Sequence, residues 1–391
     1  MSETDPFIVI GGGIGGIASA LSLAGHGFPV HVLEKAASFG ELGAGIQLGP
    51  NVFRALDRLG LKQAVLADVW RPGALEMRDA LTGASVTRMP LGPDLEAHFG
   101  EPYAVTFRAD LHAAMLRAAA ENPLIRLDTG CTVDAFAQTE SGVSLTVNGT
   151  DTLHGRALIG ADGLWSAVRR HVVGDGTPDV SGHIAYRAVL KREEVPDDLW
   201  SPDVILWAGP KTHLVQYPLR RGELFNLVAV FHSDKYVEGW NAEGDIGELR
   251  ARFAGQRPEV QRLLDRIETW RMWVLCDREP VREWSKGRIT LLGDAAHPML
   301  QYLAQGACMA TEDAVRLGDE VAASPDDLPA AFLRYQNARY LRTGKVQLTA
   351  RVYGEIYHAS GVKAELRNAM LAARTPAQAY AGMEWLYGAA A

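Results

Sequence analysis

Glycine spacing near the start of the chain could bind a dinucleotide. Gly11, Gly13 and Gly16 form the pattern G-x-G-x-x-G within residues 11–16 (GGGIGG). Gly11 permits a tight turn, Gly13 lets the backbone approach a pyrophosphate, and Gly16 allows a helix to pack closely on a strand. The free N–H groups at the start of that helix would face the phosphates. The run therefore predicts binding of a diphosphate-containing nucleotide.

The elements around these glycines must position them, and their patterns fit. Residues 7–10 (FIVI) predict a buried strand, 17–24 a helix and 30–33 a second strand. Glu34 closes that strand 18 residues after Gly16 (34 − 16), where a carboxylate can accept hydrogen bonds from a ribose. The alternative is a glycine-rich turn without a ligand. The strand, turn, helix and terminal acid together favour the dinucleotide.

Two later motifs and one arginine extend the candidate site. Asp162 and Gly163 lie in LIGADGLWSAVRR, and Asp294 lies in GRITLLGDAAHPM directly after a predicted strand at 289–292. The carboxyl ends of strands are where α/β sheets bind ligands, so Asp294 is a candidate ligand contact. Its alternative role is a helix N-cap. Arg108, in TFRADLHAAM, is a further candidate ligand contact, and the alternative is that it forms a surface ion pair.

In this order the motifs resemble those of the single-component FAD-dependent aromatic hydroxylases over nearly the whole chain. The resemblance implies FAD, with Asp294 on the ribityl chain and Arg108 at the phosphates. It places Asp162 and Gly163 beside the pyrophosphate and links them to nicotinamide-nucleotide use. The candidate cofactor contacts are Gly11, Gly13, Ile14, Gly15, Gly16, Glu34, Lys35, Gly45, Gln47, Arg108, Asp162, Gly163, Asp294, Gly306 and Ala307.

A helix predicted to begin near Gly306 supplies another part of the flavin site. Its first N–H groups would face the N1–C2=O edge of the flavin, where the reduced ring carries negative charge. Gly306 and Ala307 are small enough for the ring to approach. We expect Glu312 and Asp313, further along this helix, to be packing residues and not catalytic groups.

A strand-like run, THLVQYPL at 212–219, carries candidate substrate contacts. Alternate residues of a strand share a face, so His213 and Tyr217 would point one way and Gln216 the other. Histidine and tyrosine on a face that covers a flavin would form a polar site. The alternative is an ordinary half-buried strand whose His and Tyr find backbone partners.

The loop HPMLQYLAQGA has an unusual glutamine. Many aromatic hydroxylases have a proline where this chain has Gln301, and the chain also departs from them at Ala304 and Cys308. Glutamine adds two donors and an acceptor at this place. The alternative is a loop amide that ties down its own backbone. Together with HLVQYPLR, the loop resembles the 3-hydroxybenzoate 6-hydroxylases, which implies that His213, Tyr217 and Gln301 line the substrate site.

The resemblance also implies a reaction. NADH or NADPH would reduce FAD, O2 would form a hydroperoxide at flavin C4a, and 3-hydroxybenzoate would be hydroxylated para to its hydroxyl to give gentisate. A phenol has a pKa near 10, so a base should help, and His213 is the candidate. Tyr217 and Gln301 would orient the ring. An apolar wall of Val215, Tyr302 and Leu303 would exclude water.

Some alternatives stay open at this point. Arg187 and Arg220 are both candidates to bind the substrate carboxylate, and no spacing compels either. A salicylate 1-hydroxylase or a related heteroaromatic acid hydroxylase is a close rival within the family, against which the strand with His213 and Tyr217 and the loop residue Gln301 argue. A flavin reductase that never inserts oxygen is less favoured, because the chain has no second G-x-G-x-x-G. A flavin-binding protein without catalysis is the remaining alternative.

The predicted fold is α/β: a Rossmann-like FAD-binding domain, an inserted antiparallel β-sheet substrate domain and a C-terminal helical region. Residues 335–358 predict one long amphipathic helix, and the final Ala-rich stretch predicts looser order. The expected domains are 1–75, 100–180 and 275–325 for FAD, 76–99 and 181–274 for substrate, and 326–391 for the helices.

Composition limits the classes of partner. The net charge of -8 argues against nucleic acid, whose phosphates need a basic surface. No apolar run is long enough for a transmembrane helix, and no secretion signal precedes the first strand. The three cysteines have no metal-ligand spacing and fit a reducing cytoplasm. The expected partners are an aromatic acid, O2 and NAD(P)H, with a homodimer as a family-based expectation.

Overall fold

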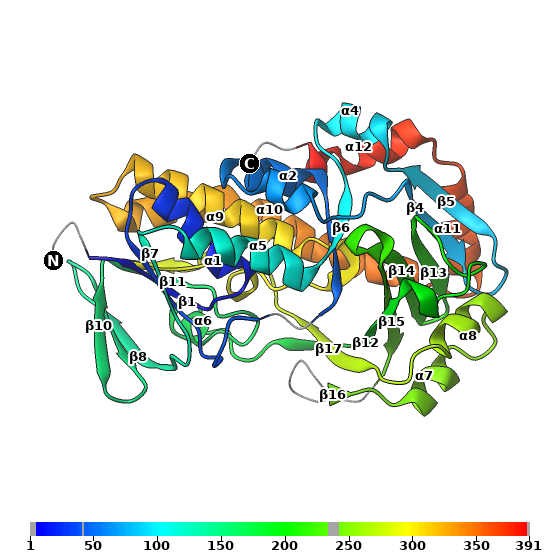
Figure 1. The fold of residues 1–391 in the computed structure, drawn as a ribbon, viewed down its shortest axis with the longest axis horizontal. Helices are drawn as coiled ribbons and strands as arrows, with labels where there is room; N and C mark the ends of the chain where they lie inside the picture. Colours follow the sequence, from blue (N-terminus) through cyan, green and yellow to red (C-terminus); the bar gives the residue numbers. More distant parts are fainter. Residues whose placement is uncertain (1–4, 41–42, 234–241, 389–391) are drawn as a thin grey trace.

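The computed structural model describes residues 5–40, 43–233 and 242–388, and its two large sheets lie in opposite halves of the view in Figure 1. The elements up to residue 172 are β1 (Phe7–Ile10), α1 (Ile14–Gly25), β2 (Val30–Leu33), β3 (Gly45–Leu48), α2 (Pro50–Arg58), α3 (Lys62–Leu66), β4 (Ala74–Asp79), β5 (Ser85–Pro90), α4 (Pro93–Phe99), β6 (Ala104–Phe107), α5 (Arg108–Ala120), β7 (Ile125–Asp128), β8 (Val133–Gln138), β9 (Val143–Val147), β10 (Asp151–Gly155), β11 (Ala157–Gly160) and α6 (Ala167–Val172). The later elements are β12 (Asp179–Lys191), η1 (Arg192–Glu194), β13 (Val204–Gly209), β14 (Thr212–Leu219), η2 (Arg220–Gly222), β15 (Leu224–His232), β16 (Ala242–Glu243), α7 (Ile246–Arg252), α8 (Pro258–Leu264), β17 (Arg271–Asp277), β18 (Ser285–Lys286), β19 (Ile289–Leu291), η3 (Gly293–Ala295), η4 (Gln301–Leu303), α9 (Gly306–Ala323), α10 (Leu328–Tyr357), α11 (Val362–Ala372) and α12 (Pro376–Tyr387).

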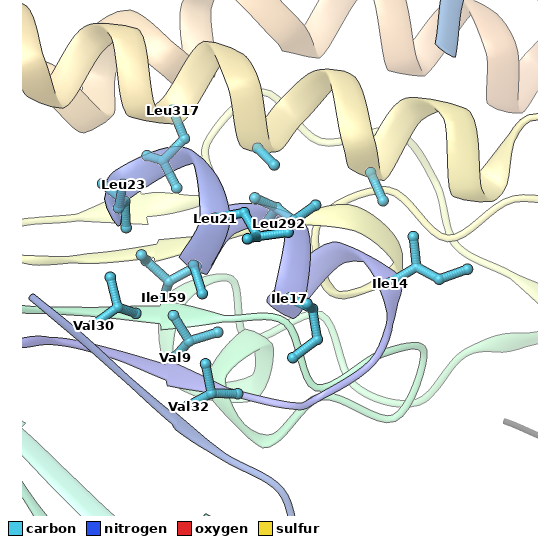
Figure 2. Close-up of a cluster of buried hydrophobic side chains, with 14 of the residues drawn as sticks. Val9, Ile14, Ile17, Leu21, Leu23, Val30, Val32, Ile159, Leu292 and Leu317 are labelled. Carbon is cyan, nitrogen blue, oxygen red and sulfur yellow. The ribbon is translucent and has the colours of Figure 1, made fainter. Parts of the chain in front are cut away.

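The first sheet has the Rossmann-like arrangement that the sequence predicts. Its strand order is β18-β19-β11-β1-β2-β7, and every pair from β19 to β7 is parallel. The two strands predicted around the glycine run are confirmed as β1 and β2. Helix α1 packs between this sheet and α9, with Ile17 and Leu21 in the apolar contact that Figure 2 shows. Burial of such side chains holds the turn after β1 in place.

The second sheet differs from expectation in one strand pair. Its order is β16-β17-β12-β15-β14-β13-β4-β5, and its pairs are antiparallel except β13 with β4. The prediction of an antiparallel sheet is wrong at that pair. A long segment of chain connects β4 to β13, so no tight turn forces the two strands to run antiparallel. The strands of this sheet come from residues 74–90 and 179–277, while the exact domain boundaries stay a prediction.

The C-terminal region is helical, as predicted. The long helix is α10, which begins earlier than expected because Asp327 accepts a hydrogen bond from Ala330 N at 3.1 Å and caps it. Figure 1 shows α10 alongside α9. The final Ala-rich stretch, which is predicted to be looser, comes after α12, whose Tyr380, Leu386 and Tyr387 are buried. Residues 389–391 lie outside the described residues.

None of the helices described combines the length and apolar composition needed to cross a membrane. Cys131, Cys276 and Cys308 are free thiols.

Candidate active site

A cavity of about 710 Å³ lies between the turn after β1, the start of α9 and strand β14. This volume is within the range that suits small-molecule and cofactor sites. The predicted cofactor residues in its wall are Gly13, Ile14, Gly15, Gly45, Gln47, Arg108, Gly163, Asp294, Gly306 and Ala307. These residues come from widely separated parts of the chain, and the fold brings them to one cavity.

Two predicted glycines shape the cavity from behind its wall. Gly11 has φ +106°, and a Cβ there would lie 2.3 Å from the carbonyl oxygen of Ala161. A Cβ at Gly16 would lie 1.9 Å from the carbonyl oxygen of Gly11. Close packing therefore explains both glycines: Gly11 lies in the tight turn, and Gly16 lies where the helix contacts the strand.

The acids outside the cavity wall bind backbone groups. Glu34 accepts hydrogen bonds from Gly12 N at 2.7 Å and Ala36 N at 2.8 Å, while Lys35 is exposed beside it. Asp162 accepts from Ser166 Oγ at 2.5 Å and Ala167 N at 2.7 Å at the start of α6. Burial raises the pKa of Asp162. The structure does not bring these side chains into the cavity wall: Glu34 is held by the glycine loop and by Ala36 N, and Asp162 by the start of α6.

Two helix N-termini at the cavity fit a flavin dinucleotide. Helix α1 follows Gly13 and α9 follows Gln305, and neither N-cap residue makes a side-chain hydrogen bond to its helix. Their first N–H groups can therefore bind a ligand that is negatively charged or polar. Asp294 in η3 is exposed and lines the same cavity beside Gly306. This arrangement suits a pyrophosphate at α1, a ribityl chain at Asp294 and a flavin ring at α9.

A buried ionic network holds η3 and α9 together. Asp313 accepts hydrogen bonds from Gly293 N at 3.1 Å, His297 Nε2 at 2.5 Å and Arg339 Nε at 2.7 Å. Glu312 pairs with Arg339 at 2.7 Å. Burial raises the pKa of Asp313, but His297 and Arg339 outweigh it, and the net result is a pKa of about 2. The expectation that both acids serve packing agrees with these contacts.

The substrate strand has the predicted alternation. His213, Val215 and Tyr217 line the cavity. Leu214 and Gln216 lie on the other face, where the side-chain oxygen of Gln216 accepts from Trp207 Nε1 at 3.2 Å. The polar face of β14 thus meets the cavity. Tyr302 and Leu303, proposed as an apolar wall with Val215, also line it.

Gln301 reaches an arginine. Its side-chain oxygen accepts from Arg187 Nη2 at 2.5 Å, and the Arg187 guanidinium lies 5.1 Å from the centre of the Trp273 ring. No carboxylate of the described residues is within ion-pair distance of Arg187, and its Nε has no hydrogen-bond partner there. Burial lowers the pKa of Arg187 to about 10, so it is still a cation at neutral pH. Gln301 therefore contacts the side chain of Arg187, whereas the alternative predicted a bond to the backbone of its own loop.

The second arginine candidate is elsewhere. Arg220 forms a two-bond ion pair with Asp110, both at 2.7 Å, and its side chain is 43% exposed. Among the described residues, Arg187 lines the cavity and Arg220 does not. The structure therefore separates two residues that the sequence left equal.

The contacts of His213 were not visible in the sequence. Its Nδ1 is 2.7 Å from Nε2 of His358, which follows α10. Burial, with a smaller effect of nearby His183, lowers the pKa of His213 to about 3. His358 lies 145 residues away from His213 in the chain, and no local pattern marks their contact. Sequence reasoning also missed the cavity residues of α11, α12 and the turn between them, which are Met370, Leu371, Arg374, Ala379, Met383 and Tyr387.

Comparisons with known proteins agree with this geometry. A family model described as "FAD binding domain" matches residues 4–342. The 3-hydroxybenzoate 6-hydroxylase of Polaromonas naphthalenivorans (strain CJ2) is 45% identical over 98% of this chain and 96% of that protein. Klebsiella pneumoniae HpxO, solved with FAD and uric acid, is 27% identical, with TM-score 0.86 over 98% of this chain and 97% of that one. A salicylate hydroxylase substrate complex is 26% identical, with TM-score 0.82 over 99% and 96%.

Proposed function

The chain belongs to the FAD-dependent aromatic hydroxylases, and from this membership we propose that it hydroxylates 3-hydroxybenzoate to gentisate with NAD(P)H and O2. FAD, when bound and reduced, supplies the activated oxygen atom. The chain's own residues must then hold the substrate ring, direct one carbon toward that oxygen and exclude water. The relative at 45% identity carries the name of this reaction, which supports the choice of substrate.

The observation that carries the proposal is the polar corner of the cavity. His213, Tyr217, Gln301 and Arg187 all line it, together with apolar side chains such as Val215, Leu206 and Val228. A ring with one carboxylate and one hydroxyl needs a cation at one end and a hydrogen-bond partner at the other. This corner offers both.

We assign the substrate carboxylate to Arg187. Its guanidinium is buried, has no carboxylate partner among the described residues and is oriented by Gln301. A buried cation that is held in place binds an anion strongly, because charge-assisted hydrogen bonds are stronger away from water. The Gln301 amide group would fix the guanidinium plane and the substrate beside it.

His213 would accept the proton of the substrate hydroxyl. It is neutral at pH 7, so a ring nitrogen can take a hydrogen bond from a phenol. A general base works best with a pKa near the working pH, and the pKa of His213 is well below it. Acceptance of the proton at His213 is therefore only a first step, after which the proton must pass to another group.

The oligomer and location are part of the same proposal. We propose a homodimer, supported by exposed apolar side chains on α10 and α11, which are Leu333, Leu341, Leu348, Val352, Val362, Leu366 and Met370. A cytoplasmic location fits the free thiols. Sedimentation of the purified protein would test the dimer. A single monomeric species at micromolar concentration would contradict it.

The first experiment measures NADH and O2 consumption by the flavin-loaded protein with 3-hydroxybenzoate and, separately, with salicylate. Gentisate formed from 3-hydroxybenzoate in near-equal amount to NADH consumed is the expected result. The solved salicylate hydroxylase makes salicylate the second candidate substrate. Catechol from salicylate, with no gentisate from 3-hydroxybenzoate, would replace the proposed substrate and keep the family.

A further inference from the structure

A chain of three histidines leads away from the cavity. His213 Nδ1 lies 2.7 Å from His358 Nε2, and His358 Nδ1 lies 2.9 Å from His232 Nε2. His213 is 3% exposed and His358 6%, whereas His232 is half-buried. The chain thus starts at a residue of the cavity wall and ends at one that reaches the outside of the described structure.

Backbone hydrogen bonds fix the positions of the three histidines relative to one another. His358 follows the last turn of α10, and its carbonyl accepts from Lys211 N at 3.0 Å. The carbonyl of Lys211 in turn accepts from His232 N at 3.1 Å. His213 is on β14, and His232 ends the neighbouring strand β15. The end of α10 is therefore fixed to the strands that carry the other two rings.

We propose that His213, His358 and His232 form a proton relay that carries the proton of the substrate phenol from the cavity to solvent. The proposal rests on the hydroxylase function proposed above. His213 uses Nδ1 for His358, which leaves Nε2 for the substrate hydroxyl. His358 uses both of its ring nitrogens within the chain, so its role is to pass a proton on and not to contact substrate.

Each transfer breaks one N–H or O–H bond and forms another. The substrate O–H breaks as an N–H forms at His213 Nε2, and the proton at His213 Nδ1 moves to His358 Nε2. The proton at His358 Nδ1 moves to His232 Nε2, and the one at His232 Nδ1 leaves to water. The net result is a phenolate in the cavity and a proton in solvent. The reverse transfers restore the starting tautomers when the product phenolate takes a proton.

The environment of the three histidines disfavours their protonated, charged forms. Burial lowers the pKa of each of the three histidines, and neighbouring histidines add to this for His213 and His358. Imidazolium therefore does not accumulate in the relay at neutral pH. Within the described residues, the titratable and charged groups that face the three rings are His183, Tyr302, Tyr357, Lys211, Arg252 and Glu355.

The chain offers a matched control in the same cluster. The His183 ring lies 4.2 Å from the His232 ring, centre to centre, and its Nδ1 is 2.6 Å from Tyr302 Oη. It lies beside the relay and is not one of the links between His213 and His232. Asparagine at this position can place an amide group near Nδ1, so His183→Asn should keep the contact with Tyr302.

The test compares His232→Gln with His183→Asn in the flavin-loaded protein. Glutamine can keep the hydrogen bond that His232 Nε2 makes, but it cannot carry a proton from one nitrogen to the other. We expect His232→Gln to lower the rate of product formation at least about fivefold at neutral pH, with unchanged FAD content. Added imidazole, an external proton acceptor, should restore the rate. His183→Asn should behave as the wild type, with or without imidazole.

Substrate acidity gives an independent readout. Ring-fluorinated 3-hydroxybenzoates have more acidic phenols, so the deficit of His232→Gln should shrink as the phenol pKa falls. A wild-type rate in His232→Gln, a loss that imidazole does not rescue, or an equal loss in His183→Asn would each overturn the relay. His358→Gln, checked for FAD content, provides a second interruption of the chain. Failure of the proposed function would appear differently, as no gentisate from the wild type, and the same variants would then be compared on salicylate.

Discussion

At the scale of single residues, one buried arginine answers how a protein of net charge -8 can bind an anion. Arg187 lines the cavity with no carboxylate within ion-pair distance among the described residues, and Arg108 and Arg374 line the same cavity. Local potential inside a cavity depends on the nearest charges and not on the net charge. The negative surface therefore does not prevent the binding of an aromatic acid.

Replacing Arg187 should weaken the binding of the carboxylate specifically. In Arg187→Gln, a hydrogen bond to a charged group worth about 2 kcal/mol is lost, so the Kd for 3-hydroxybenzoate should rise on the order of 30-fold. The neutral amide 3-hydroxybenzamide should bind wild type and variant nearly equally. Flavin absorbance changes on titration measure both. The control is Arg220→Gln, which removes a surface ion pair, and an equal loss of affinity in that variant would contradict the assignment.

Gln301 and Asp294 should separate catalysis from cofactor binding. Gln301→Ala removes the partner of Arg187 and should lower coupled hydroxylation about tenfold or more, while the protein keeps its flavin. The Asp294→Ala protein should instead lose FAD on dialysis, because the change removes a carboxylate that lines the cavity beside α9. Flavin content and the ratio of product to NADH measure the two effects. The reverse pattern would make Gln301 a structural loop residue.

At the scale of elements, the turn from β1 into α1 determines how closely the helix can approach the sheet. Gly16 touches the backbone of Gly11 with no space for a side chain, whereas Gly25 at the other end of α1 has nothing within 4 Å of a Cβ. The two glycines thus have different reasons to be present in the same helix.

The pair provides a test of the turn. Gly16→Ala should lower stability by about 3 kcal/mol or more and reduce FAD content, because its methyl group would overlap a backbone carbonyl. Gly25→Ala should change stability by less than about 1 kcal/mol, with a tendency to stabilise the helix. Thermal unfolding and flavin content would measure both. Similar behaviour of the two variants would show that helix propensity, and not close packing, governs Gly16.

The sequence predicted elements well where the reason for them is local. The bounds of β1 and β2 follow from apolar runs, and the face that His213 and Tyr217 share follows from strand geometry. The sequence could not predict the contact of His213 with His358. It also did not distinguish Arg187 from Arg220 as the residue that binds the substrate carboxylate. These features depend on which distant segments pack together, and residue type alone does not contain that information. The parallel pairing of β13 with β4 was missed for the same reason.

At the scale of the whole molecule, buried charges join the FAD-binding region to the C-terminal helices. Arg339 of α10 pairs with Glu312 and Asp313 of α9, and Asp313 also holds the turn at Gly293. Breaking a buried ion pair is costly because the remaining charge stays in the interior. The network therefore contributes to the stability of the protein and to the shape of its cofactor site together.

This network should give the protein an acid-sensitive component of stability. The pKa of Asp313 is about 2 when folded, against roughly 3.9 in an unfolded chain. Its contribution, about 2.5 kcal/mol, is present above pH 4 and is lost as the pH falls toward 2. Asp313→Asn should destabilise the protein by about 3 kcal/mol at pH 7, and by less as the pH approaches 2. Unfolding measured across this range checks it, and a constant difference would contradict it.

The order in which the ribosome releases the chain has a consequence for the cavity. The central strand β1 is made before its sheet is complete, because one edge of the parallel part waits for β19, and the cavity wall waits for Tyr387 of α12. Chains are synthesised at about 5–20 residues per second, so a nascent protein spends many seconds with an open site. A cofactor that binds before Tyr387 has been made therefore meets an incomplete cavity wall, and only later synthesis can enclose it.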